Sequence, residues 1–123
     1  MKKIYFFINL LLSNHSLLRT FQIIEFLNIN IKNRSIEFGA QPNKQKNFSY
    51  LVKNRSNFDY SNLFNDKKNN IFYSDLTKKL RIKSNKYENV LLFNVLEHLT
   101  DYRKSFFEIK RILKKNGIFI GST

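Results

Sequence analysis

The class of fold follows from residues 90–123, VLLFNVLEHLTDYRKSFFEIKRILKKNGIFIGST. The first four of these, 90–93, form a continuous apolar run, which is typical of a strand buried on both faces of a parallel sheet. An amphipathic helical stretch follows, and a second apolar run at 118–120 predicts another strand. Strand, helix and strand in this order indicate an α/β fold with a mainly parallel sheet.

The helix between these two strands has a predicted start and a predicted end. We expect Thr100 to cap its amino end, with Asp101 in the first turn, where the helix dipole favours a negative charge. Asn116 and Gly117 would form a left-handed cap at its carboxyl end. The predicted inward face consists of apolar residues at helical spacing: Tyr102, Phe106, Ile109 and Leu113, with Ile112 beside them.

Three more strands are predicted earlier in the chain, at 35–38, 58–64 and 71–73. We expect a short helix at 48–52 and, before the strand at 90–93, a charged loop anchored by Leu80 and Ile82. Strands that alternate with helical stretches predict a Rossmann-like sheet of about five strands with flanking helices.

The N-terminal segment, 1–34, is predicted to be helical and to pack on the sheet domain, 35–123. Its apolar run at 4–12 follows two lysines, as in a secretory signal, but no small-x-small cleavage site comes after it. The run is about half as long as a membrane span requires, so we expect a cytoplasmic protein without a membrane span. The helical pattern that begins at Ser16 has one predicted apolar face: Leu17, Phe21, Ile24 and Leu27.

The chain of 123 residues carries a formal net charge of +13, which raises the question of a nucleic-acid partner. Lys and Arg neutralise phosphates and release their counterions. The alternative is a coding bias, since Lys, Asn, Ile, Phe and Tyr use A/T-rich codons and are abundant here. We favour this alternative, because the cations are spread along the chain instead of gathering in one stripe, although a nucleic-acid partner stays open. Cysteine is absent, which excludes disulfides and thiolate metal sites.

Two motifs lie where predicted strands end, which is where open α/β sheets bind ligands. Glu37 ends one strand and Gly39 opens the next loop, an arrangement that brings backbone amides close to a nucleotide. Taken alone, Gly39 is better explained as only a turn residue, and no G-x-G-x-x-G pattern of NAD or FAD enzymes follows it. Asp75 could accept a hydrogen bond from an exocyclic amine while Leu76 packs on a flat ring, and the alternative for Asp75 is a turn cap.

A third motif, NVLEHL at 94–99, follows the strand at 90–93. His98 could act as a base or bind a metal, but the only other histidine is His15, in a separate predicted helix, so we predict no metal site. Over direct catalysis we favour the alternative that Glu97 and His98 tie down the loop before the helix.

Together, these motifs resemble the class I S-adenosylmethionine-dependent methyltransferases over residues 35–123. Glu37 and Gly39 match the start of the family's first motif, an acidic residue followed by glycines. The carboxylate and apolar residue that the family sets against adenine correspond to Asp75 and Leu76. The fourth-strand motif at the methionine end of the cofactor resembles 94–99, with Glu97 and His98 as weaker catalytic candidates near the methyl group. The resemblance implies S-adenosylmethionine as cofactor, contacted by Glu37, Gly39, Ala40, Asp75, Leu76 and Asn94.

The sequence departs from the family at three places. Gln41 and Asn43 stand where the first motif has its second and third glycines, so their side chains would crowd the methionine carboxylate or require a rearranged loop. The acidic residue that ends the family's second strand and holds the ribose hydroxyls corresponds to Asp59 or Asn62. The sixth and seventh strands have no counterpart, so we expect a chain truncated after the fifth strand, whose exposed edge a partner or a further C-terminal segment covers.

The resemblance implies an enzyme that transfers a methyl group to an O, N or C nucleophile, with the acceptor undefined. One alternative is an inactive methyltransferase fold that serves as a binding module. Another alternative is a basic nucleic-acid-binding protein, which the charge and the scattered aromatic residues would suit.

Overall fold

The computed structural model describes residues 5, 8–10, 12–13, 16–53 and 55–122. The chain divides into two compact units, Met1–Asn30 and Ile31–Thr123. Much of the apolar run at 4–12 lies outside the described residues. Within the described residues, no helix combines the length and the apolar character that crossing a bilayer requires.

The first unit contains helix α2, Leu17–Leu27, at the predicted position. The predicted apolar face was wrong, because Leu17 and Phe21 are exposed whereas Ile23 and Phe26 are buried. Apolar residues occupy much of the circumference of α2, so their spacing alone fits more than one inward face.

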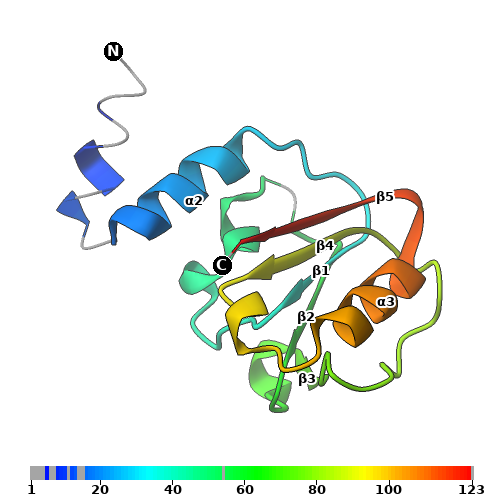
Figure 1. Cartoon of the computed structure of the whole chain (residues 1–123). Coiled ribbons are helices and arrows are strands. Elements are labelled where there is room, and N and C mark those ends of the chain that lie inside the picture. Colours follow the sequence, from blue (N-terminus) through cyan, green and yellow to red (C-terminus); the bar gives the residue numbers. More distant parts are fainter. Residues whose placement is uncertain (1–4, 6–7, 11, 14–15, 54, 123) are drawn as a thin grey trace. The chain divides into compact units, whose positions relative to one another are not determined.

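The second unit is built on a parallel sheet, which has five strands in the described part of the chain (Figure 1). The strands are β1 (Ser35–Phe38), β2 (Phe58–Asn62), β3 (Ile71–Tyr73), β4 (Tyr87–Phe93) and β5 (Leu113–Ser122). They lie in the order β3-β2-β1-β4-β5, and every neighbouring pair is parallel, so the predicted α/β fold class is confirmed. The strand order reverses between β1 and β4, which is the position at which doubly wound sheets bind ligands.

Helix α3 spans Tyr102–Ile112 and lies along one face of the sheet (Figure 1). Asp101 caps it, not Thr100 as predicted, and the Asp101 carboxylate accepts a hydrogen bond from a first-turn amide at 3.1 Å. The helix ends earlier than predicted, because the amides of Asn85 and Lys86 satisfy its last two carbonyls. Strand β5 then begins at once.

The predicted left-handed cap lies inside β5. Asn116 has a φ of +65°, as its type suggests, but no helix ends there. The left-handed residue instead accompanies an irregularity in the pairing of β5 with β4, where the register shifts between Tyr87 and Asn89.

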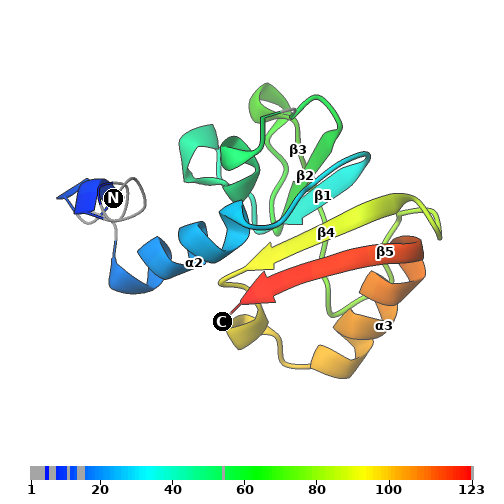
Figure 2. The same ribbon diagram turned by 90° about the horizontal axis from the view of Figure 1, so that it is seen from above.

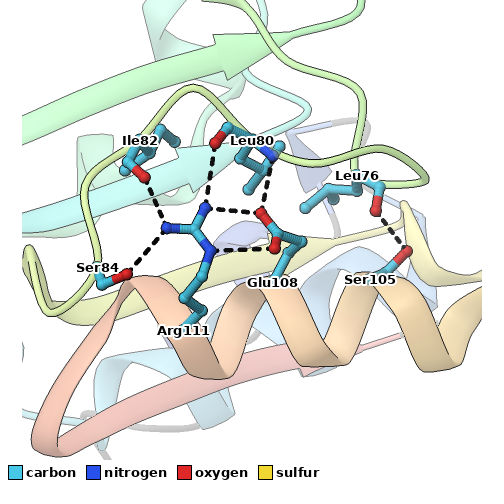
Figure 3. Close-up of polar contacts among 7 residues, drawn as sticks. All are labelled: Leu76, Leu80, Ile82, Ser84, Ser105, Glu108 and Arg111. Atoms are coloured by element: carbon cyan, nitrogen blue, oxygen red, sulfur yellow. Dashed lines mark hydrogen bonds and ion pairs between the residues drawn. The ribbon is translucent and has the colours of Figure 1, made fainter.

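The inward face of α3 is partly polar. Ile109 and Ile112 are buried as predicted, but Tyr102 is 57% exposed and Phe106 is 40% exposed, so this half of the prediction was wrong. The other buried positions are Ser105 and Glu108. Both of them bind the backbone of the loop at 74–86 instead of packing on apolar side chains (Figure 3).

The connections between strands contain short 3-10 turns. Two of them, η1 (Lys44–Lys46) and η2 (Phe48–Leu51), lie between β1 and β2, where we had predicted a helix at 48–52. The other two are η3 (Lys67–Asn69), before β3, and η4 (Leu96–His98), after β4.

The loop at 74–86, between β3 and β4, contains no helix in the structure and is held from both sides. Leu80 and Ile82 are buried in the core, as predicted. From α3, the guanidinium of Arg111 donates to the carbonyls of Ile82 at 2.8 Å and Leu80 at 3.1 Å, and also pairs with Glu108 (Figure 3). This clamp fixes a segment that has no regular structure of its own.

Candidate functional site

Glu37 positions the loop that follows β1. Its side chain is 4% exposed, and its two carboxylate oxygens accept hydrogen bonds from the amides of Phe48 at 2.8 Å and Ser49 at 2.9 Å. These amides begin η2, where N–H groups have no partner within the turn. Glu37 therefore lies beneath the loop, with both oxygens engaged by it.

Gly39 makes the sharp turn out of β1. Its φ is +75°, a conformation that favours glycine, and a Cβ atom placed there would lie 2.6 Å from Cγ2 of Val95. Val95 follows β4, so the two loops at the reversal point of the sheet touch at Gly39.

The rest of this loop is fixed by amide side chains. The amide of Gln41 donates to Oδ1 of Asn47 at 2.7 Å, and Nδ2 of Asn47 donates back to the carbonyl of Gln41 at 3.1 Å. Asn43 caps η1. The side chains of Gln41 and Asn43 are exposed, so the loop accommodates both of these replacements of glycine at its surface.

The two candidates for the ribose position lie toward opposite ends of β2. Asp59 is the second residue of β2, near its amino end, where it accepts a hydrogen bond from the hydroxyl of Tyr87 and pairs with Arg34 and Lys86. Asn62 is the last residue of the strand and lies at the carboxyl edge.

The carboxamide of Asn62 is already engaged at both ends. Its Nδ2 donates to the carbonyl of Ala40 at 2.8 Å, and its Oδ1 accepts from the amide of Leu63 at 2.7 Å. The amide of Ala40 in turn donates to the carbonyl of Ser61 at 3.0 Å, and Ala40 is fully buried. The end of β2 is therefore neutral and tied to the loop that follows β1.

Asp75 follows β3 by two residues and is half-buried. Its Oδ1 accepts hydrogen bonds from the amide and hydroxyl of Thr77, and its Oδ2 lies 3.4 Å from Nζ of Lys78. These hydrogen bonds, together with the charge of Lys78, hold the pKa of the Asp75 carboxyl below its usual value. Leu76 is 5% exposed, and its side chain belongs to the core cluster, so Leu76 offers a ligand its backbone and not an apolar surface.

The segment after β4 carries the remaining predicted residues. Asn94 is exposed, has a φ of +54°, and donates its amide to the carbonyl of Ser122 at 3.1 Å. Glu97 and His98 are exposed, and neither side chain makes a hydrogen bond or ion pair within the described residues. Backbone bonds close this turn, so the prediction that these two side chains tie down the loop was wrong.

The parallel register brings the ends of four strands to one edge. Phe38 of β1 pairs with Ser61 and with Leu92, and Asn62 pairs with Tyr73. In Figure 2, the arrowheads of β4 and β5 lie at the same edge of the sheet. Gly39, Asn62, Asp75 and Asn94 all follow or end strands at this edge.

Two features of the edge were not predicted. Val95 contacts Gly39, and the ring of Phe48 stacks on that of Phe93 with 3.6 Å between centroids. The only signal for Val95 was its place in the NVLEHL motif. Within the described residues, no three His, Cys, Asp or Glu side chains come together as a metal site would require, and His15 is not among them.

A parallel sheet in this order, with a glycine turn after β1 and a carboxylate after β3, defines an α/β fold of the nucleotide-cofactor-binding class. The methyltransferase domain family matches residues 14–121, and the chain belongs to this family. Comparison with curated protein sequences returned no significant match.

Several solved structures share the fold, and two of the following three are described as possible or putative methyltransferases. One is described as a possible histamine N-methyltransferase from Thermotoga maritima, with a TM-score of 0.65 and 17% identity over 81% of this chain and 48% of that chain. Another is a putative S-adenosylmethionine-dependent methyltransferase from Methanococcus maripaludis, with a TM-score of 0.59 and 21% identity over 82% and 55% of the two chains. The YcgJ protein of Bacillus subtilis matches with a TM-score of 0.60 and 12% identity, over 82% and 49%. The chain thus spans about half the length of these structures.

Proposed function

We propose that this chain binds S-adenosylmethionine at the carboxyl edge of its sheet and takes part in methyl transfer to an acceptor. The observation that carries the proposal is the coincidence of the family match, over 14–121, with the glycine turn at Gly39 and the carboxylate of Asp75 on one sheet edge. When bound, the cofactor supplies an electrophilic methyl group on a sulfonium.

The chain's own residues fit this cofactor unevenly. Gly39 allows the sharp turn that leaves β1 and the close approach of Val95 to it, and Oδ2 of Asp75, whose one partner in the described part of the chain is the exposed end of Lys78, can accept from an exocyclic amine. Glu37 would act by positioning the loop. At the ribose position, Asn62 offers a neutral side chain that is already bonded, so we expect weaker cofactor binding than an acidic residue would give.

The binding-module alternative is supported by the residues near the expected methyl position. A chain that holds the cofactor without turning it over would need the adenine contact at Asp75 but no arrangement around the methyl group. Glu97 and His98, the two candidates there, are exposed and make no side-chain hydrogen bond or ion pair within the described residues. We also propose that the protein acts in the cytoplasm, which the short apolar run at 4–12 supports.

The test is calorimetric titration with S-adenosylmethionine on the wild type, Asp75→Asn and Asp66→Asn. Asp66 is a matched control, because it also accepts a hydrogen bond from an amide of its own turn, at 3.2 Å, but belongs to the turn before β3 and not to the segment that follows β3. A hydrogen bond to a charged group is worth about 1.5–3 kcal/mol, so Asp75→Asn should weaken binding about tenfold to a hundredfold.

Asp66→Asn should leave the affinity unchanged. Wild-type protein that does not bind, or equal losses in the two variants, would overturn the proposal. Transfer of a labelled methyl group from the cofactor to any acceptor in a cell extract would distinguish an enzyme from a binding module.

A further inference from the structure

A cavity of about 530 Å³ lies under β3 and the loop at 74–86. Asp75 belongs to its lining, so the cavity adjoins the candidate cofactor site. The other lining residues are Asn65, Phe72, Tyr73, Ser74, Lys78, Lys79, Leu80, Arg81 and Ile82. It therefore combines apolar, aromatic and cationic side chains.

The charge of this cavity is not neutralised from within. Its one carboxylate, Asp75, accepts from Thr77 through Oδ1 and lies 3.4 Å from Lys78 through Oδ2, whereas Lys79 and Arg81 have no carboxylate within ion-pairing distance in the described part of the chain. The amino edge of the same sheet is different, because Asp59 pairs there with both Arg34 and Lys86. The cations beside β3 are thus available to an external anion.

The loop that carries these cations is held in place before any ligand binds. The Arg111 guanidinium and the Glu108 carboxylate bind the backbone of Leu80 and Ile82 (Figure 3). Leu80 and Ile82 are buried whereas Lys79 and Arg81 are exposed, so the anchored residues alternate with the cations. A fixed loop loses little conformational entropy when its cations engage a ligand.

Exposed aromatic rings accompany the cations. Tyr73, in the lining, is 50% exposed, and Phe64, on the turn that leads to β3, is 40% exposed. Aromatic faces bind unstacked bases, and Lys and Arg bind the phosphates that join them. Such a surface suits a single strand better than a duplex, whose bases are already stacked.

We propose that this cavity binds the phosphodiester backbone of a single-stranded nucleic acid, with a base against Tyr73, and that this nucleic acid is the methyl acceptor. The acceptor role rests on the proposed function, because it requires a methyl donor at the adjoining edge. Binding of the strand does not rest on it. Under this proposal, the part of the chain's positive charge that lies at this cavity binds the strand, whereas the coding bias accounts for the general abundance of Lys.

The experiment measures the binding of labelled oligouridylate and oligothymidylate to the full chain by fluorescence anisotropy, without cofactor. Lys79→Gln combined with Arg81→Gln removes two charges from the cavity. The control is Lys110→Gln combined with Lys115→Gln, which removes two charges from another cavity, of about 470 Å³, beside the start of β5.

We expect Lys79→Gln with Arg81→Gln to reduce the magnitude of the slope of log K against log salt concentration by about 1.4, since each phosphate contact on a single strand contributes about 0.7 to this slope. The control pair should change this slope far less. Equal changes in the two double variants would show that net charge alone binds the strand and would overturn the proposal. Displacement of the oligonucleotide by inorganic tripolyphosphate at equal affinity would assign the cavity to a small anion and would also overturn it.

The base contact is tested by Tyr73→Ala against Tyr102→Ala, an exposed tyrosine on α3. Loss of one stacked base should weaken binding about five- to hundredfold at Tyr73 and leave it unchanged at Tyr102. Equal effects at the two tyrosines would contradict the placement. Failure of cofactor titration with intact strand binding would reject the methyl-transfer proposal and the acceptor role, and would leave the binding site standing.

Discussion

The contact between Gly39 and Val95 gives a prediction whose size follows from the geometry. In Gly39→Ala, the new residue must keep a φ near +75°, which costs an L-residue about 1–2 kcal/mol. Its Cβ must also displace Cγ2 of Val95 from a separation of 2.6 Å, and overpacking of this kind costs about 1–3 kcal/mol. Val95 is stiff at χ1 and borders the core cluster, so the overlap is not relieved by a simple rotation. We expect Gly39→Ala to lower the free energy of unfolding by about 2–5 kcal/mol.

A double-mutant cycle separates these two costs. Val95→Ala alone should cost about 1 kcal/mol, because it removes two methyl groups from a half-buried site. In the double variant, the overlap is absent and only the backbone strain remains, so the double variant should be about 1–3 kcal/mol more stable than the sum of the single effects predicts. The chain has no tryptophan, so urea unfolding is best followed by circular dichroism. Additivity within about 0.5 kcal/mol would refute the contact between the two loops.

Three further predictions concern the groups that support the site. The Glu37 carboxylate accepts hydrogen bonds from two backbone amides, and Glu37→Gln places an NH₂ group against one of these N–H donors. The free energy of unfolding should therefore fall by about 1.5–3 kcal/mol in urea titrations. Arg111→Met leaves a nearly buried carboxylate unpaired and frees two loop carbonyls, which should cost about 3 kcal/mol and speed hydrogen exchange in the loop at 74–86. Partial burial raises the pKa of Asp59, but the hydrogen bond from Tyr87 and two neighbouring cations outweigh it and lower that pKa below its usual value. The stabilisation from Asp59 is therefore present above about pH 3.9 and is lost as the pH falls through the folded pKa, and Tyr87→Phe should move this loss to higher pH in acid-unfolding curves.

The strands could be predicted because burial in a parallel sheet leaves a simple pattern. The run at 90–93 is apolar at every position, and it lies inside β4 as predicted. The inward face of α3 could not be predicted, because the loop at 74–86 has no helix of its own and needs backbone partners. Ser105 and Glu108 supply them, at the expense of apolar positions such as Tyr102 and Phe106.

Most of the positions with left-handed backbone conformation could not be predicted from the sequence either. The chain has only three glycines, and five asparagines in the described residues have positive φ values: Asn33, Asn70, Asn85, Asn94 and Asn116. Asparagine tolerates this conformation better than other residues with a side chain. A composition that we attribute to coding bias therefore supplies the turns that glycine would otherwise make. Only Asn116 was marked in advance, because Gly117 follows it.

Asparagine also accounts for a difference between two parts of the candidate site, because the end of β2 carries the neutral Asn62 whereas the segment after β3 carries the charged Asp75. A carboxylate at the end of β2 could not donate to the carbonyl of Ala40, but the carboxamide of Asn62 does so at 2.8 Å. That bond, with the reciprocal pair between Gln41 and Asn47, fixes a loop in which two 3-10 turns stand in place of the predicted helix. Loop order here depends on neutral amides, and a ribose at this edge would have to compete with them. At β3, by contrast, Asp75 keeps its charge and one accessible oxygen, so we expect recognition at this edge to depend on the base more than on the sugar.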